Sequence, residues 1–345
     1  MIFKHLTLFS LVSVMLLGCT CNTNLSEITV TCDEVGSQID LMVDGNLFTS
    51  FRYTTDYEKP FLYPIYSPDG QMITRGFPID PRPGERTDHP HHIGMWFNHG
   101  NVNGLDFWNN SSAIQDKTNY GHIVVTKILE AKGGKRAHLK VLSEWRDQAE
   151  VVLLEETTDY YITATVDSRT IDRLSTLKAI QDVTITDNKE GLIAVRVDKA
   201  FEKPSNETQV FTDEHGNTTV VEVQDSSGAN GMYYGSSGKT GDDIWGTRND
   251  WVMLSAEKDG NVISFGFFDH PSNVGYPFHS HARGYGLFAC NNLGAKVFNP
   301  GEEEILVTLA KGESLTLKHR FYLETGSKVP TERADSIFTA FSGKY

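Results

Sequence analysis

The succession of strand-like segments with almost no helix constrains the fold of this chain more than any other feature of its sequence. Apolar or alternating runs of strand length recur along it, and turn signals such as Lys132-Gly133-Gly134 and Asp259-Gly260-Asn261 separate them. The expected strands span residues 39–43, 48–53, 123–130, 138–145, 151–165, 171–186, 193–197, 218–223, 251–256, 262–268 and 314–323. Strands joined by turns, without alternating helices, predict an all-β antiparallel sandwich or barrel.

Two local patterns add detail to this fold. Asp44-Gly45 stands between two apolar runs and predicts a hairpin. Pro330 opens a segment through Phe341 that we expect to form a short helix, with Ile337, Phe338 and Phe341 on one apolar stripe. No break in composition and no internal repeat divides residues 28–345, which predicts a single β domain.

The N-terminal segment has the pattern of a bacterial lipoprotein signal. Lys4 precedes an apolar run over residues 6–17, and Leu-Leu-Gly-Cys ends at Cys19. A membrane-spanning anchor is the alternative, but the run is shorter than the roughly 20 residues that a span needs. We therefore expect residues 1–18 to be removed, Cys19 to be lipidated and residues 19–27 to be a tether. The implied location is the cell envelope, in the periplasm or at the outer membrane, with membrane contact only through the lipid.

Charge and cysteine usage exclude some classes of protein. The net charge is −14, and removal of Lys4 with the signal makes it −15, which argues against a nucleic-acid partner. Besides Cys19 there are three cysteines. Cys290 lies in an apolar run and is expected to be a buried small hydrophobe. A disulfide between Cys21 and Cys32 stays open as an alternative to free thiols.

Residues 80–108 contain four of the twelve histidines together with prolines, glycines and charged side chains. Proline forbids helix there, and glycine allows turns that other residues resist. We expect a rigid polar loop with aromatic walls, and such loops are common places for sites. The side chains concerned are Arg82, Glu85, Asp88, His89, His91, His92, Trp96, His99 and Trp108.

A second segment, residues 269–283, repeats this chemistry with Asp269, His279, His281 and Arg283. In an extended backbone residues two apart point to one side, so His89 with His91 and His279 with His281 would form two pairs that face one point. Three interpretations stay open: an acid/base or substrate-binding pocket, a metal site with an added carboxylate, and a purely structural network. We expect no obligatory cofactor or metal, although a bound metal ion stays an alternative.

Isolated histidines are expected to be structural. His319 falls on the apolar face of the last strand, where a hydrogen-bonded core histidine is the simpler interpretation. The same holds for His122, His138 and His215. Trp251 begins an apolar strand and is also expected in the core.

Several longer motifs resemble a bacterial family known as "PmoA-like", after a methane oxygenase subunit. They are PFLYPIYSPDG, ITRGFPIDPRPGERTDHPHHIGMWFNHGNVNGLDFW, NKEGLIAVRV, DIWGTRNDWV, FFDHPSN and FHSHARGYGLFACNNLG, and they cover most of the chain after the signal. The resemblance implies a secreted β protein of the kind found among carbohydrate-utilisation proteins. This chain departs from the family wording at Phe278-His279-Ser280, so the resemblance supports His281 more than His279.

The closing segment, residues 309–322, is similar to the last strand of galactose mutarotase-like supersandwiches, which bind sugars in an open cleft. That similarity implies a carbohydrate or another small polar ligand, with Trp96, Trp108 and Trp245 as apolar faces for sugar rings.

Three hypotheses follow. The first is an isomerase, epimerase or lyase in which histidines exchange protons with a sugar; the second is a non-catalytic glycan-binding lipoprotein; the third is a metal-dependent oxygenase, as the family name suggests. The predicted catalytic residues are His89, His91, His92 and His281. The predicted substrate-binding residues are Arg82, Glu85, Asp88, Trp96, His99, Trp108, Trp245, Asp269, His279 and Arg283.

Overall fold

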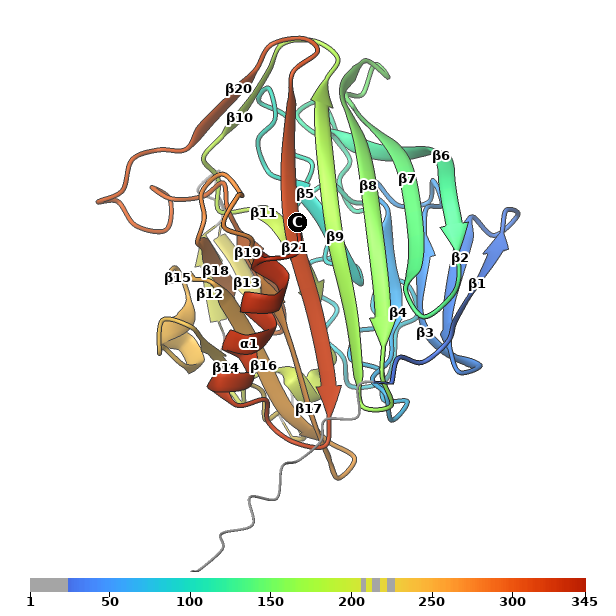
Figure 1. Cartoon of the computed structure of the whole chain (residues 1–345). Coiled ribbons are helices and arrows are strands. Elements are labelled where there is room, and N and C mark those ends of the chain that lie inside the picture. The colour runs from blue at the N-terminus through green and yellow to red at the C-terminus, as the bar shows by residue number, and fades with distance from the viewer. Residues whose placement is uncertain (1–23, 206–208, 213–217, 222–226) are drawn as a thin grey trace, which may run out of the picture.

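Two large antiparallel sheets face each other in the computed structural model, which describes residues 24–205, 209–212, 218–221 and 227–345 (Figure 1). The nine-stranded sheet has the order β1 (Ile28–Asp33), β2 (Gln38–Val43), β3 (Asn46–Arg52), β4 (Phe61–Ile65), β5 (Met95–His99), β11 (Gly191–Arg196), β19 (Leu287–Asn291), β18 (Phe278–Ala282), β15 (Arg248–Asn249). The eight-stranded sheet has the order β14 (Met232–Gly235), β16 (Trp251–Lys258), β17 (Asn261–Phe268), β21 (Ser314–Thr325), β9 (Ser168–Ala179), β8 (Val152–Ala164), β7 (Ala137–Arg146), β6 (His122–Lys132). The prediction of an all-β antiparallel sandwich is confirmed.

Smaller elements complete the described chain. Two two-stranded sheets pair β10 (Val183–Thr186) with β20 (Leu306–Leu309) and β12 (Gln209–Thr212) with β13 (Thr218–Val221). The short 3-10 helices η1 and η2 span Lys199–Phe201 and Gly241–Ile244. No helix in these ranges has the length and apolarity needed to cross a membrane.

The C-terminal helix α1 (Thr331–Ser342) begins directly after Pro330, as the sequence predicts. Phe341 is fully buried, and Ile337 and Phe338 pack beside it against the cluster that contains Trp251. The indole Nε1 of Trp251 donates a hydrogen bond to Asp335 Oδ1 at 2.8 Å. Both the apolar stripe and the core position of Trp251 are therefore confirmed.

The predicted hairpin is present, with Val43 opposite Asn46 in the β2–β3 pair. Asp44 and Gly45 both take positive φ, 48° and 82°, which a two-residue hairpin turn requires and which aspartate and glycine tolerate. The expected single strand over 171–186 is wrong. The chain leaves the eight-stranded sheet after Ala179, and β10 pairs with β20 instead, because the polar pair Gln181-Asp182 interrupts the apolar pattern.

The expectation of an all-loop region over residues 80–108 is also wrong. β5 lies inside this range, near the middle of the nine-stranded sheet, and all five of its residues are buried. β4, β18 and β19 are likewise wholly buried and were not expected as strands. Strands covered on both faces lose the alternation of apolar and polar residues by which strands are recognised in a sequence.

The main core fills the space between the sheets. β7 shows how one face contributes to it, because its residues alternate strictly between buried and partly exposed positions. The central strands of the nine-stranded sheet also bury their other face, where Phe61, Trp96, Ala194, Leu287 and Ala289 belong to a second apolar cluster. Connecting segments therefore cover the outer face of this sheet, and most of the predicted site residues lie there, but His99 and Asp269 do not. The signal segment, Cys19 and Cys21 lie outside the described residues.

Candidate functional site

One row of paired residues crosses the middle of the nine-stranded sheet and joins the two predicted histidine segments. His281 on β18 pairs with Ala289, Ala289 with Ala194, Ala194 with Trp96, and Trp96 with Phe61. Directly paired residues in antiparallel strands point to the same face. Neighbouring strands are about 4.8 Å apart, so roughly 14 Å separates the backbones at His281 and Trp96. The two histidine segments therefore share the outer face of this sheet.

A ladder of parallel rings extends over this face from Trp96. His92 stacks on Trp96 with ring centroids 5.3 Å apart, His89 on His92 at 4.8 Å, and Tyr285 on His89 at 5.1 Å. Tyr285 belongs to the turn between β18 and β19, so the ladder returns to the strand pair that carries His281. We call the set His89, His91, His92, Trp96, His279, His281, Arg283 and Tyr285 the histidine face.

A turn, and not an extended strand, presents the first three histidines. His89 has a positive φ of 46°, and the His92 amide donates to the His89 carbonyl at 3.0 Å. The expectation that His89 and His91 project together from extended backbone is therefore wrong, although the turn still brings their rings to 5.6 Å. His279 and His281 do alternate on β18 and share its outer side, as predicted.

Asp88 anchors this turn through two buried arginines. Its Oδ1 accepts hydrogen bonds from Arg75 Nη1 at 2.8 Å and Arg196 Nη2 at 2.7 Å, and its Oδ2 lies 2.9 Å from His89 Nδ1. Burial opposes ionisation of Asp88, but the two guanidinium groups and His89 hold its pKa well below the usual range. Asp88 therefore positions the histidine turn and has little capacity left to bind a ligand.

His92 is fixed in the same network. Its Nδ1 lies 3.1 Å from Arg196 Nη1, which can only donate, so Nδ1 accepts and the proton of the neutral ring is on Nε2. Burial lowers the pKa of His92 well below its usual value, helped by His91, His89 and the arginines. His91 is half-buried, no hydrogen bond to it is found within the described ranges, and burial lowers its pKa in the same way. His91 is thus the member of the turn best placed to meet a ligand.

The second cluster centres on His281 and Glu190. His281 is buried, its Nδ1 has no hydrogen-bond partner among the described residues, and Glu190 Oε2 lies 3.9 Å from it. Burial lowers the pKa of His281 well below its usual value, with help from Arg283 and Lys189. Burial raises the pKa of Glu190, which Lys189 partly opposes. A neutral imidazole therefore stands beside a carboxyl group that retains its proton to a higher pH than usual.

His279 is more firmly tied than His281. Its Nε2 is 3.2 Å from Glu302 Oε1, and its ring stacks on Phe298 at 5.3 Å. Arg248 donates to Glu302 as well, with Nε to Oε2 at 3.0 Å. Arg283 lies 4.7 Å above the Trp245 ring, and both side chains are half-buried at the margin of the histidine face.

Lys59 is a buried cation that the sequence analysis missed. Its Nζ donates to the Trp108 carbonyl at 2.8 Å and lies 5.5 Å from the centre of the Trp96 ring. No ion pair to it is found in the described part of the chain, and burial lowers its pKa to about 7. Glu190 and Tyr285 were missed too. Each stands inside a motif quoted for the resemblance, but neither has the histidine spacing that drew attention to the site.

Four predicted site residues lie elsewhere or are otherwise engaged. His99 is on the core side of β5, where its Nε2 is 2.8 Å from the Thr186 carbonyl. Asp269 is also on the core side, bonded to Asn273 at 2.7 Å and Asn292 at 2.8 Å. Arg82 and Glu85 pair with each other, with Arg82 Nε to Glu85 Oε1 at 3.0 Å. The structure therefore does not bring His99 or Asp269 to the histidine face.

The structural histidines lie where expected. His319 is buried, with Nε2 2.8 Å from Asn292 Oδ1, and burial lowers its pKa to about 3. His138 pairs with Asp159 at 2.7 Å, and His122 with Glu150 at 3.3 Å. His215 lies outside the described residues. Cys290 is fully buried, as predicted, and Cys32 is exposed and forms no disulfide with another described residue.

Whether a metal ion could bind depends on how the histidine, cysteine, aspartate and glutamate side chains are arranged. Within the described ranges no group of three or more histidine, cysteine, aspartate or glutamate side chains has an arrangement that could hold a metal ion. The imidazoles of the 89–92 turn face arginine, tyrosine and one another, and Asp88 is bound to two guanidinium groups. Among the described residues these imidazoles stack on neighbouring rings and are not arranged around a common point as metal ligands are.

Comparisons with known proteins give a family without an assigned activity. The family model described as "Family of unknown function (DUF6807)" matches residues 38–339. No curated protein matches. The description of this family does not carry the methane oxygenase name that the resemblance suggested.

Solved structures with a similar arrangement are distant. The galactosidase domain of α-galactosidase-sucrose kinase, AgaSK, has a TM-score of 0.39 and 10% identity, over 86% of this chain and 42% of that chain. An α-galactosidase from Geobacillus stearothermophilus has a TM-score of 0.34 and 11% identity, over 87% of this chain and 41% of that chain. A galactose mutarotase related enzyme from Lactobacillus acidophilus has a TM-score of 0.28 and 9% identity, over 87% of this chain and 97% of that chain. The chain spans less than half of the two galactosidase chains, and likenesses at this level carry no argument about the site.

Proposed function

Because this chain belongs to the family of unknown function DUF6807, we propose its function from the site itself: the histidine face binds a carbohydrate and exchanges protons with it. The observation that supports this is the row His281–Ala289–Ala194–Trp96, which puts both histidine segments on one face of one sheet. Rings with flat apolar faces and unsatisfied polar nitrogens occur together there, and sugars offer the matching combination of C–H faces and hydroxyls.

The polar atoms available to a ligand belong mainly to rings. Nε1 of Trp96, Trp108 and Trp245, and Nδ1 of His279 and His281, are buried without a hydrogen-bond partner in the described part of the chain. Buried polar atoms are normally paired, so a concentration of unpaired ones in one region favours a site whose partners come from a ligand or from water. Indole N–H groups can only donate, and a neutral imidazole can accept, which suits sugar hydroxyl groups.

The proposed chemistry is proton transfer of the isomerase, epimerase or lyase type. In this scheme His281 accepts a proton from a sugar carbon or hydroxyl group, because its depressed pKa keeps it neutral. Glu190 provides a proton, because its raised pKa keeps its carboxyl group protonated over a wider pH range. His91 and Arg283 contact the ligand from the half-buried margin. Proton transfer by a positioned side chain is typically worth about 10² to 10⁴ in rate.

Turnover on a panel of monosaccharides and disaccharides tests this proposal. His281→Gln keeps a side chain with hydrogen-bonding groups but removes the titration, so turnover should fall by about 10² to 10⁴ while sugar binding survives. His138→Gln is the matched control, since His138 pairs with Asp159 on the other sheet. If His281→Gln weakens binding and wild type has no turnover on any sugar, the face is a glycan-binding surface without catalysis.

We also propose that the protein is attached to the cell envelope by a lipid on Cys19. The support is the sequence pattern of residues 1–19, and it is independent of the site. A sugar-binding face on a lipid-anchored protein would work outside the cytoplasm, at the periplasmic or outer surface of a membrane.

A further inference from the structure

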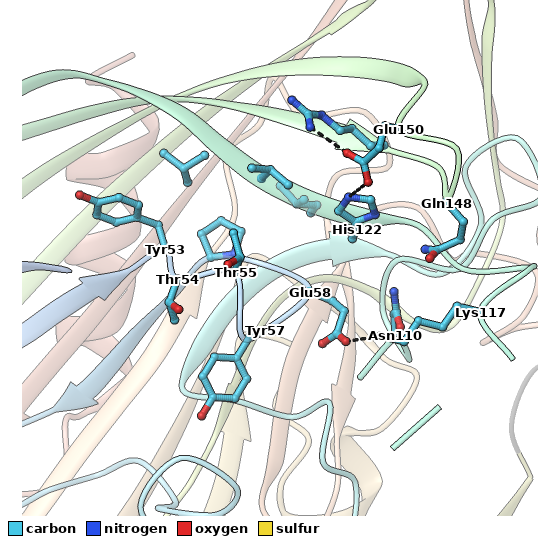
Figure 2. A pocket seen from close by; sticks show the side chains of 15 residues that line it. Tyr53, Thr54, Thr55, Tyr57, Glu58, Asn110, Lys117, His122, Gln148 and Glu150 are labelled. Carbon is cyan, nitrogen blue, oxygen red and sulfur yellow. Dashed lines mark hydrogen bonds and ion pairs between the residues drawn. The ribbon is translucent and has the colours of Figure 1, made fainter. Parts of the chain in front are cut away.

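A pocket lies away from the histidine face, where the edge of the eight-stranded sheet meets the connection between β3 and β4. Its volume is about 410 Å³, within the range of roughly 300–1,000 Å³ that small-ligand sites occupy. The walls come from residues 53–60, from the start of β6, from the end of β7 and from the segment that holds Asn110 and Lys117. Figure 2 shows Tyr53 and Tyr57 on one side and Asn110, Lys117 and Gln148 on the other.

The charged groups in this pocket are paired with one another. Lys117 forms an ion pair with Glu58, and Glu150 contacts Arg146 at 2.9 Å and His122 at 3.3 Å (Figure 2). Because Lys117 and Arg146 each lie beside a carboxylate, Glu58 and Glu150 respectively, an ionic ligand would have to break an ion pair to gain one. The pairing therefore favours a ligand without net charge.

Asn110 supplies a buried acceptor that lacks a donor. Its side chain is 1% exposed, and its Nδ2 donates to the Gly121 carbonyl at 2.8 Å. Its Oδ1 is buried and has no hydrogen-bond partner within the described ranges. In Figure 2 the amide of Asn110 points into the space between Glu58 and Gln148. A hydroxyl group of a ligand is the kind of donor that satisfies such an oxygen without bringing a charge.

Two tyrosines make the opposite wall, and other rings hold them in place. Tyr57 meets Phe61 edge to face with centroids 5.3 Å apart, and Tyr53 stacks on Phe51 at 5.8 Å. Ring faces of this kind pack against the C–H face of a pyranose, while amide and hydroxyl groups bind its hydroxyls. A pocket with aromatic rings on one side, amide groups on the other and internally balanced charges has both features.

We propose that this pocket binds a neutral saccharide of one or two units, at a site separate from the histidine face. The partition between the two sites is thin: Tyr57 and Glu58 line the pocket, whereas Lys59 turns the other way and bonds the Trp108 carbonyl. Asn110, two residues after Trp108, lines the pocket again. The proposal does not need the histidine face to bind sugar, because the pocket has its own acceptor, rings and charge balance.

Calorimetric titration with neutral hexoses and disaccharides, followed by a crystal structure with the best binder, tests the assignment. Tyr57→Ala should weaken binding at this pocket about five- to tenfold, because one stacking ring is lost, and Tyr57→Phe should leave it nearly unchanged. Thr55→Trp should abolish it by filling the pocket from an exposed position. Thr126→Trp, exposed on β6 but outside the lining, is the matched control, and His281→Gln should leave this site intact.

Each contrary outcome overturns the proposal. No saturable binding of any neutral sugar at millimolar concentration would do so, as would sugar density only at the histidine face. Binding that Thr55→Trp leaves unchanged, in a protein of wild-type thermal stability, would place the ligand elsewhere. Tighter binding of an acidic sugar that weakens with added salt would show that an unpaired charge, and not the neutral chemistry argued here, selects the ligand.

Discussion

Burial decides the protonation of the side chains on the histidine face. Removal from water lowers the pKa of His91, His92 and His281 well below the usual value for histidine, and it raises the pKa of Glu190. Burial therefore favours the neutral form of both groups, and in the proposed mechanism the His281 imidazole accepts a proton while the Glu190 carboxyl group donates one. This division of roles follows from environment alone, because no metal or charged ligand is needed to produce it.

The pH dependence of turnover tests these roles. Activity that needs His281 neutral and Glu190 protonated should rise with pH through the depressed pKa of His281 and fall again through the raised pKa of Glu190. Glu190→Gln should lower the rate and remove the falling limb, and His281→Gln should remove the rising limb. A wild-type profile whose falling limb persists unchanged in Glu190→Gln would contradict the assignment of Glu190 as donor.

The free energy of unfolding should depend on pH, because burial shifts the pKa values of these side chains in the folded state. A histidine with a depressed folded-state pKa is protonated first in the unfolded chain, so its contribution is complete above about pH 6.5 and is lost as pH falls. Because burial lowers the pKa of His319 to about 3, its contribution to stability should fall by about 1.4 kcal/mol per pH unit between about pH 6.5 and about pH 3.

Thermal unfolding between pH 7 and 5 checks this second prediction. The melting temperature of the wild type should decrease steadily as the pH falls from 7 to 5, and that of His319→Asn should decrease less over the same interval. Asp269 acts in the opposite direction, because its pKa is raised to about 7 and its stabilisation grows as pH falls from there. An Asp269→Asn variant should therefore show a steeper acid loss than wild type. Parallel curves for all three proteins would contradict the account.

Elements, and above all turns, determine which histidines meet. The alternation of His279 and His281 was predicted by assuming extended backbone, which holds because β18 is a strand. The same assumption failed for residues 89–92, because His89 takes a positive φ that the sequence does not indicate. Pairing across the sheet was beyond prediction as well. No local pattern shows that Ala194 and Ala289 separate Trp96 from His281, because that depends on which strands are neighbours. The ring types and the two segments could be predicted, and their register could not.

Replacing Asp88 tests whether its carboxylate anchors the histidine turn. Asp88→Asn removes the charge that Arg75 and Arg196 share while keeping the size of the side chain. Two buried guanidinium groups would lose the carboxylate charge that they share, so the free energy of unfolding should fall by about 3–5 kcal/mol. Urea unfolding measures the change. Asp116→Asn, at an exposed position, should leave stability unchanged, and a loss for Asp88→Asn no larger than that of this control would contradict its role as anchor.

In the molecule as a whole, the two sheets differ in how their faces are buried and in whether they carry the candidate site. In the eight-stranded sheet, β7 and most of β8 alternate between buried and partly exposed residues, and the strands of this sheet were largely foreseen from sequence. The nine-stranded sheet is covered on both faces in its middle, where β5, β18 and β19 escaped prediction although β11 was expected, and that second covered face is where the histidines gather. The features that hid these strands from sequence analysis are therefore the same ones that build the candidate site.

The N-terminal prediction also belongs to the whole molecule. If Cys19 carries the lipid, Cys19→Ala should leave the protein unprocessed or release it from the membrane fraction, because the tether has no other apolar anchor. Fractionation with detection of the mature chain distinguishes these states. Normal processing with unchanged membrane retention would contradict lipidation. Exposed Cys32→Ser provides a control that should not move between fractions.

The most direct test of the central claim is a crystal structure of the protein with a sugar that it turns over or binds. The account predicts that the sugar lies on the outer face of the nine-stranded sheet, with a hydroxyl or ring atom within about 3 Å of the His91 or His281 imidazole and a pyranose face against the half-buried Trp245. Failure of every sugar in the panel to bind, or density confined to regions away from both histidine segments, would contradict it.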